Sequence, residues 1–189
     1  MSVRNTKEGW GWPARLIHWS VSLMILGLLG VGFFMANFVD DIGLQFTLTQ
    51  IHKSWGFTVF VLVLIRMVWR FMNPTPQLPA AMSPVERGLA HGGHLALYVL
   101  MLAMPLSGWL MSSASPLQEL YGIKNKVFSL FEMPDPFVPG SKELEDVFAN
   151  IHYFCAIALS VVVLAHAAAA LKHHFIEKDN VLRRMILGR

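Results

Sequence analysis

The sequence contains few charged residues. Asp, Glu, Lys and Arg together make up 14% of its 189 residues, against about 25% in an average soluble protein. Hydrophobic residues account for 54% of the chain, so the composition indicates a membrane protein. The formal net charge of +3 comes from bases at the ends of apolar runs, and this placement does not indicate nucleic-acid binding.

Cysteine is also scarce, and acidic residues are absent from the middles of the apolar runs. Both features exclude several classes of metal site and haem attachment. Cys155 is the only cysteine, so no internal disulfide can form, and without a C-x-x-C-H motif covalent haem attachment of the usual kind is excluded. The middles of the apolar runs contain no Asp or Glu. The chain therefore lacks the side-chain ligands that a zinc or di-iron centre would need there.

Four apolar runs are long enough to cross a hydrocarbon layer of about 30 Å, which takes about 20 helical residues. They cover residues 13–38, 49–71, 84–112 and 147–176. The first is about twice as long as the hydrophobic region of a typical signal peptide, so we interpret it as a span. The sequence predicts an all-α fold, a transmembrane four-helix bundle, in a single domain over residues 1–189.

Local signals add detail to this fold. Ser83 and Glu86 form the pattern of a capping box at the start of the third helix. Residues 119–131 mix bases with large apolar side chains, which favours a short helix on the membrane surface. Bases gather near both termini and in the second connection, whereas the first and third connections are acidic. Because bases near span ends stay on the cytoplasmic side, both termini should be cytoplasmic.

Two histidines in the fourth span have a spacing that places them on one helix face. His152 and His166 are fourteen residues apart, which separates them by ~21 Å in depth and by only about 40° around the helix. His18, near the inner start of the first span, matches the depth of His166. His52, near the outer start of the second span, matches the depth of His152. We therefore predict an inner pair, His18 with His166, and an outer pair, His52 with His152.

Other interpretations of these histidines remain open from the residues alone. A single intramembrane histidine is often a hydrogen-bonding group between helices. His91 and His94 start the third span on the inner side. Either of them could replace His18 on depth alone.

Two imidazoles on opposite sides of one metal leave four positions open, which is the axial arrangement of a bis-histidine haem iron. We therefore predict two b-type haems, one for each pair. Their propionates would need cations, and the candidates are Arg66 and Arg15 on the inner side and Lys53 on the outer side. Arg66 could instead extend its guanidinium to the interface. Gly32 lies at the depth of the outer pair, where a small residue would leave room for the macrocycle or simply pack against another helix.

Several stretches resemble the bacterial cytochrome b561 family over nearly the whole chain. They are RLIHW at 15–19, IHKSWG at 51–56, GHLALYVLMLAMPLSGWLM at 93–111 and HAAAALKHHFIEKDNVLRRM at 166–185. The resemblance implies a dihaem protein of the bacterial inner membrane. It also implies that His18, His52, His152 and His166 are the axial ligands of the haem irons, and that His91 and His94 are not.

The resemblance further implies quinone-linked electron transfer with ubiquinone as substrate, and in one branch oxidation of superoxide at the outer face. His173 lies seven residues after His166, on the same face and ~10 Å further inward, where it could contact a quinone carbonyl or simply be a solvated interfacial histidine. The acidic outer connections do not favour attraction of the superoxide anion, so a periplasmic redox partner is an alternative donor. A second alternative function is a haem-bearing anchor or electron-relay subunit for a periplasmic redox partner. A small histidine-based transporter is a less favoured alternative, because the spans contain no acidic partners for the histidines.

Overall fold

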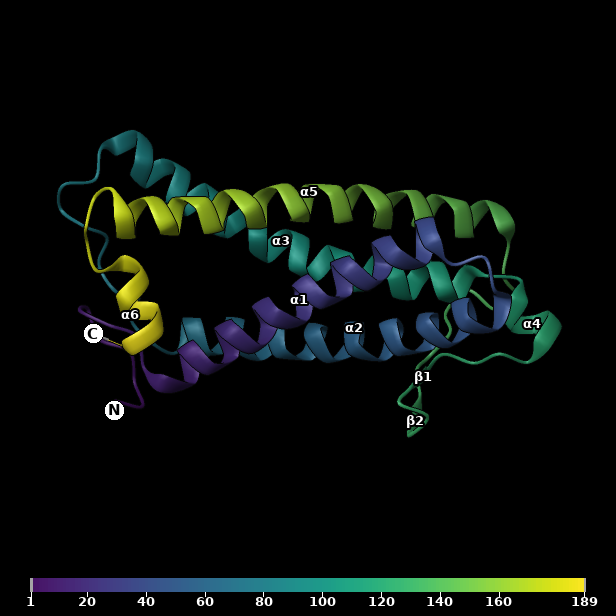
Figure 1. Ribbon diagram of the computed structural model, residues 1–189. Helices are drawn as coiled ribbons and strands as arrows, with labels where there is room; N and C mark the ends of the chain where they lie inside the picture. The colour runs from purple at the N-terminus through teal and green to yellow at the C-terminus, as the bar shows by residue number, and fades with distance from the viewer. Residues whose placement is uncertain (1, 189) are drawn as a thin grey trace. The chain divides into compact units, whose positions relative to one another are not determined.

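The computed structural model describes residues 2–188, and most of them are helical (Figure 1). Within this range four helices are long and apolar enough to cross a membrane. They are α1 (Trp12–Phe38), α2 (Ile42–Phe71), α3 (Pro84–Ala114) and α5 (Lys142–Phe175). A helix satisfies its backbone hydrogen bonds internally, as a lipid environment requires. The all-α prediction is confirmed.

Two of these helices begin five or more residues before the apolar runs do. Helix α2 begins seven residues before the expected start, and Asp41 Oδ1 caps it by accepting a hydrogen bond from the Leu44 amide at 2.7 Å. Helix α5 begins five residues early, and Lys142 forms an ion pair with Asp146 at 2.8 Å on its first turns. Caps and ion pairs one turn apart extend helices into polar sequence, which a search for apolar runs cannot detect.

The start of α3 is the capping box that the sequence predicts. Ser83 Oγ accepts a hydrogen bond from the Glu86 amide at 3.3 Å, and Glu86 Oε2 accepts one from the Ser83 amide at 3.0 Å. Two amides at the helix start, which have no partner within the helix, are thereby satisfied.

The contacts divide the chain into two compact units. Unit 1 comprises residues 1–23, 62–99 and 159–189, and unit 2 comprises residues 24–61 and 100–158. Each long helix contributes one part to each unit. Helix α6 (Val181–Leu187) belongs to unit 1, and α4 (Leu117–Tyr121), β1 (Lys126–Val127) and β2 (Phe131–Glu132) belong to unit 2. The prediction of a single domain stays a prediction.

In unit 1 the C-terminal helix α6 lies beside the N-terminal segment (Figure 1). Arg15 Nη1 donates a hydrogen bond to the Ile186 carbonyl at 2.7 Å. Arg184 of α6 is buried, and its Nη1 donates to the Gln77 carbonyl at 2.9 Å in the connection before α3. These contacts fix α6 against both the start of α1 and the connection between α2 and α3.

The surface helix expected over residues 119–131 is wrong. Helix α4 ends at Tyr121, where Gly122 follows in the left-handed region with a φ of +62°, and β1 then pairs antiparallel with β2. Asn125 is completely buried and its Oδ1 accepts a hydrogen bond from Lys53 Nζ at 2.9 Å. Side-chain hydrogen bonds to distant residues therefore fix this segment, and amphipathic patterning along the chain does not reveal such bonds.

Candidate functional site

The predicted outer pair comes together in unit 2. His52 of α2 and His152 of α5 have ring centroids 6.4 Å apart, with their planes at 76°. A metal bound between two imidazoles, with bonds of about 2 Å and ring centres about 1 Å beyond each nitrogen, requires roughly 6 Å between centroids. The spacing of this pair therefore fits an axially ligated iron.

The hydrogen bonds of His152 select the nitrogen that is available to a metal. Nδ1 lies 3.0 Å from the Met104 carbonyl and 3.2 Å from Ser107 Oγ. With its proton on Nδ1, the ring donates to the carbonyl and leaves Nε2 free for the metal, as metal-ligating histidines commonly do. Met104 and Ser107 were not predicted, because histidine spacing along one helix does not indicate which carbonyl the neighbouring helix presents.

Two glycines pack against the outer imidazoles. A Cβ atom at Gly108 would lie 2.9 Å from His152 Cε1, and one at Gly32 would lie 3.4 Å from His52 Cε1. The space that Gly32 leaves is thus next to the ring of His52. Gly108 makes the closer approach and was not predicted, although a glycine in the middle of an apolar span is itself a signal of close packing.

The predicted inner pair comes together in unit 1, with a third histidine beside it. The ring centroids of His18 of α1 and His166 of α5 are 6.3 Å apart, again a spacing that fits a metal between them. The His94 ring of α3 is 5.4 Å from that of His166, which is shorter than this arrangement requires. His91 is exposed, and its Nδ1 is 2.7 Å from the Arg87 carbonyl of its own helix.

Two of the four paired histidines have an unsatisfied nitrogen. In the part of the chain that the structure describes, Nδ1 of His18 and Nδ1 of His52 are buried without a hydrogen-bond partner. Buried polar atoms are nearly always paired, so such atoms require an explanation. The two unpaired Nδ1 atoms and the centroid spacings of the pairs are compatible with the b-type haem that is predicted for each pair.

Cations without an acidic partner lie next to the inner pair. Arg66 and Arg70 of α2 both stack on the ring of Tyr98 of α3, with Cζ at 5.9 and 5.7 Å from its centroid. No ion pair with Asp or Glu is found for either arginine among residues 2–188. Two unpaired guanidinium groups in membrane-spanning helices would suit the carboxylates of a haem.

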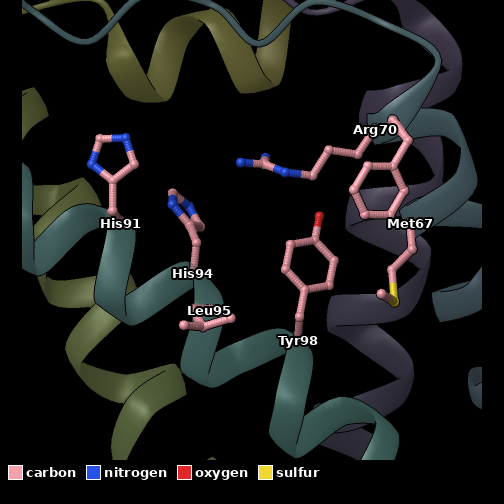
Figure 2. Close-up of a pocket in the computed structure, with 7 residues that line it drawn as sticks. Met67, Arg70, His91, His94, Leu95 and Tyr98 are labelled. Carbon is pink, nitrogen blue, oxygen red and sulfur yellow. The ribbon is translucent and has the colours of Figure 1, made fainter.

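A cavity of about 250 Å³ in unit 1 is lined by one of these arginines, Arg70. Figure 2 shows Arg70 extending from α2 toward His94, with the Tyr98 hydroxyl directed toward Arg70. The lining residues are Met67, Arg70, Phe71, His91, His94, Leu95 and Tyr98. Polar and apolar side chains from both helices therefore line the same cavity, a mixture that would suit the edge of a haem with its propionates.

The other two predicted propionate cations are engaged by protein groups. Arg15 donates to the Ile186 carbonyl, as described above. Lys53 Nζ donates to Ser112 Oγ at 3.2 Å and to Asn125 Oδ1 at 2.9 Å. Their contribution to haem binding stays a prediction.

His173 lies in unit 1, buried at the end of α5. Its Nδ1 is 2.6 Å from Glu177 Oε2 and 2.7 Å from Asp179 Oδ2. The two acidic partners were not predicted. The separation of four residues between His173 and Glu177 was a usable signal, because residues so spaced meet on a helix surface, although α5 ends at Phe175 and Glu177 lies in the bend after it.

The family model described as prokaryotic cytochrome b561 matches residues 9–188. The chain belongs to the prokaryotic cytochrome b561 family. The cytochrome is 33% identical to cytochrome b561 homolog 2 of Escherichia coli strain K12 over 186 residues, which cover 98% of the chain and 95% of that relative. It is 30% identical to the probable superoxide oxidase CybB of Yersinia pestis over 171 residues, covering 90% of the chain and 91% of that relative.

A third relative agrees with this assignment. Cytochrome b561 homolog 1 of Escherichia coli strain K12 is 28% identical over 170 residues, covering 90% of the chain and 92% of the relative. The cytochrome is therefore a bacterial membrane protein of electron transport with a b-type haem. The resemblance inferred from the histidine-containing stretches is confirmed.

Proposed function

We propose that the cytochrome transfers single electrons across the bacterial inner membrane, between a donor on the outer side and ubiquinone on the inner side. His52 and His152 would hold one b haem, and His18 and His166 a second. A bound haem alternates between ferric and ferrous iron and so supplies one-electron chemistry. The observation that carries the proposal is the spacing of the two histidine pairs, 6.4 and 6.3 Å between centroids.

The charge of each unit supports the proposed orientation. The residues of unit 1 include eleven Lys and Arg against four Asp and Glu, whereas those of unit 2 include four Lys against eight Asp and Glu. Basic residues near span ends remain on the cytoplasmic side. Unit 1, which contains both termini, would therefore face the cytoplasm.

Superoxide is one candidate for the outer donor, because one relative is named a probable superoxide oxidase. The lysines of unit 2 do not favour it. Lys124 and Lys126 pair with Glu132 at 2.7 and 3.7 Å, Lys142 pairs with Asp146, and Lys53 is held by Asn125 and Ser112, as described above. Since these four are all the cations of unit 2, a periplasmic redox partner that needs no strongly basic surface is the alternative donor.

Haem stoichiometry in two single variants tests the ligand pairs. We expect His152→Ala and His166→Ala each to lose one of two haems, measured as haem per protein and as the amplitude of the reduced-minus-oxidised spectrum. His166 is a better choice than His18, because the His94 imidazole lies close enough to replace His18 after a small movement. His91→Ala, at an exposed histidine bonded within its own helix, is the control and should retain both haems. Two full haems in either test variant would refute the assignment.

Anaerobic mixing tests the electron partners. We expect a short-chain ubiquinol to reduce the haem bands of the oxidised protein, and a separate experiment with superoxide asks whether the outer side accepts electrons from it. A protein that dithionite reduces and ubiquinol does not would contradict the quinone link. Reduction by ubiquinol and not by superoxide would assign the outer side to another redox partner.

A further inference from the structure

The hairpin formed by β1, β2 and the turn between them is attached to two of the long helices in unit 2. The Phe128 amide in the turn donates a hydrogen bond to Ser54 Oγ of α2 at 3.0 Å, and the Phe128 ring packs edge-on against Trp55, with centroids 5.2 Å apart. Trp109 Nε1 of α3 donates to the carbonyl of Pro134, just after β2, at 2.9 Å. Figure 1 shows the hairpin projecting to one side of α2. The hairpin therefore lies against the sides of membrane-spanning helices.

These attachment points set the depth of the hairpin in the membrane. The apolar run of α2 begins at residue 49, so Ser54 and Trp55 lie ~8 to 9 Å inside it by helix rise. Trp109 lies ~5 Å inside the end of the apolar run of α3 at residue 112. Tryptophan is enriched where the hydrocarbon layer meets the headgroups. Both helices therefore place the hairpin at this boundary, and the turn lies deeper than the end of β2.

The turn is apolar and exposed, whereas the strands carry charge. Leu130 is 81% exposed, and Phe128 is exposed beside it. On the strands, Lys126 pairs with Glu132 at 3.7 Å. Trp55, which contacts Phe128, is exposed on α2. Apolar surface thus continues from the side of a membrane-spanning helix onto the turn.

The backbone of the turn is suited to surroundings with little water. The Leu130 amide donates to the Val127 carbonyl at 2.9 Å, and the Phe128 amide is satisfied by the hydroxyl of Ser54, which is itself buried. A backbone group without a partner is costly in hydrocarbon. These two bonds therefore lower the cost of placing the turn among lipids.

We propose that the turn inserts into the lipid leaflet on its side of the membrane, with its apolar side chains among the upper parts of the acyl chains. The orientation proposed above makes this the outer leaflet. Lys126 and Glu132 would lie nearer the headgroups, since long charged side chains extend toward water. Interfacial elements bury their apolar side chains about 5 to 10 Å below the headgroup boundary, which matches the depth of the attachment points.

Lipid suits this surface better than a protein partner does. A soluble partner on the aqueous side would have to reach below the boundary of the hydrocarbon layer to cover Phe128 and Leu130. The sequence predicted contact of residues 119–131 with the membrane surface through a helix. The structure replaces that helix with a hairpin, and the contact we infer is made by its turn alone.

A nitroxide label on the turn tests the insertion. Leu130→Cys in a Cys155→Ala background offers one labelling site, because Cys155 is the only native cysteine. The hydrogen bond at position 130 uses the backbone amide, which cysteine keeps. Ile42→Cys in the same background is the matched control. Ile42 is 82% exposed, close to Leu130, but it lies at the start of α2, ~10 Å outside the apolar run.

The measurement is EPR power saturation of the oxidised protein in nanodiscs of phosphatidylethanolamine and phosphatidylglycerol that each hold one copy. Oxygen partitions into lipid, whereas a nickel chelate stays in water. We expect oxygen to relax the label at position 130, at a depth of about 5 to 10 Å below the headgroups, and nickel to relax the label at position 42. Spectra of the haem bands should match the native protein. Phe131→Cys, at another exposed position, replaces Leu130→Cys if that variant loses haem.

Three other outcomes would overturn the proposal. Relaxation of the turn label mainly by nickel would place the turn in water, free for a protein partner. Protection from both reagents would mean that the turn is covered by its own chain. Loss of the oxygen effect in nanodiscs that hold two copies would mean that a second copy displaces the lipid. None of these results depends on the quinone link, because the sample contains no quinone and no redox partner.

Discussion

Gly108→Ala should weaken the outer haem site selectively. The new Cβ would lie 2.9 Å from His152 Cε1, whereas two carbon atoms in contact prefer about 3.5 to 4.0 Å. The imidazole must therefore move by roughly 0.6 to 1 Å, while metal–ligand distances hold to within about 0.2 Å. We expect the affinity for the outer haem to fall by about ten- to a hundredfold, as for other disturbed supports of metal ligands.

The rate of haem transfer to excess apomyoglobin measures this affinity loss, with haem per protein after purification as a second readout. Gly32→Ala should have a smaller effect, because its Cβ would lie 3.4 Å from His52 Cε1. Gly30→Ala is the control, since no atom lies within 4 Å of its Cβ position. Alanine favours a helix over glycine by about 1 kcal/mol, so none of these changes should weaken the helix itself. Native haem transfer in Gly108→Ala would refute the reasoning.

Three further changes test the contacts around the sites. Asn125→Ala should lower the unfolding free energy by about 1 to 3 kcal/mol, because Lys53 loses a buried acceptor; thermal unfolding in detergent measures this, and an unchanged midpoint would contradict it. Arg184→Met removes the buried donor to the connection between α2 and α3 and should make the α6 region more sensitive to protease, whereas native cleavage would show that α6 is held by other contacts. The hydrogen bond from Lys124 lowers the pKa of Glu132, so the stabilisation is present at neutral pH and is lost as pH falls below about 4. The midpoint of Glu132→Gln should therefore lie below native at neutral pH and equal it in acid, and a constant difference would exclude this linkage.

The spans and the histidine pairs could be predicted because each depends on a local rule. Bilayer thickness sets the length of an apolar run, and helix periodicity sets the depth and face of His152 and His166. Whether His18 or His94 pairs with His166 could not be decided from the residues alone, because both histidines lie at the same predicted depth as His166. It depends on how α1 and α3 pack against α5, which spacing along the chain does not specify.

The remaining contacts depend on chain reversals and on backbone groups of other helices. Asp179 reaches His173 only because Lys178 adopts a positive φ, and neither glycine nor asparagine marks that position. The Met104 carbonyl is presented to His152 by a neighbouring helix. Glu177 is the exception among these contacts. Its spacing of four residues from His173 could have been used to predict that the two side chains meet.

The position of His94 beside His166 has a consequence for the evolution of this site. In the proposed inner haem site, a substitution at position 18 would remove one imidazole but leave that of His94 within a small movement of the iron. During evolution the axial ligand could therefore change from a histidine of α1 to a histidine of α3. At every step of that change a second imidazole would remain next to the proposed iron. Relatives with a different amino acid at the position of His18 should accordingly be examined for a histidine at that of His94 before they are classed as lacking the inner haem.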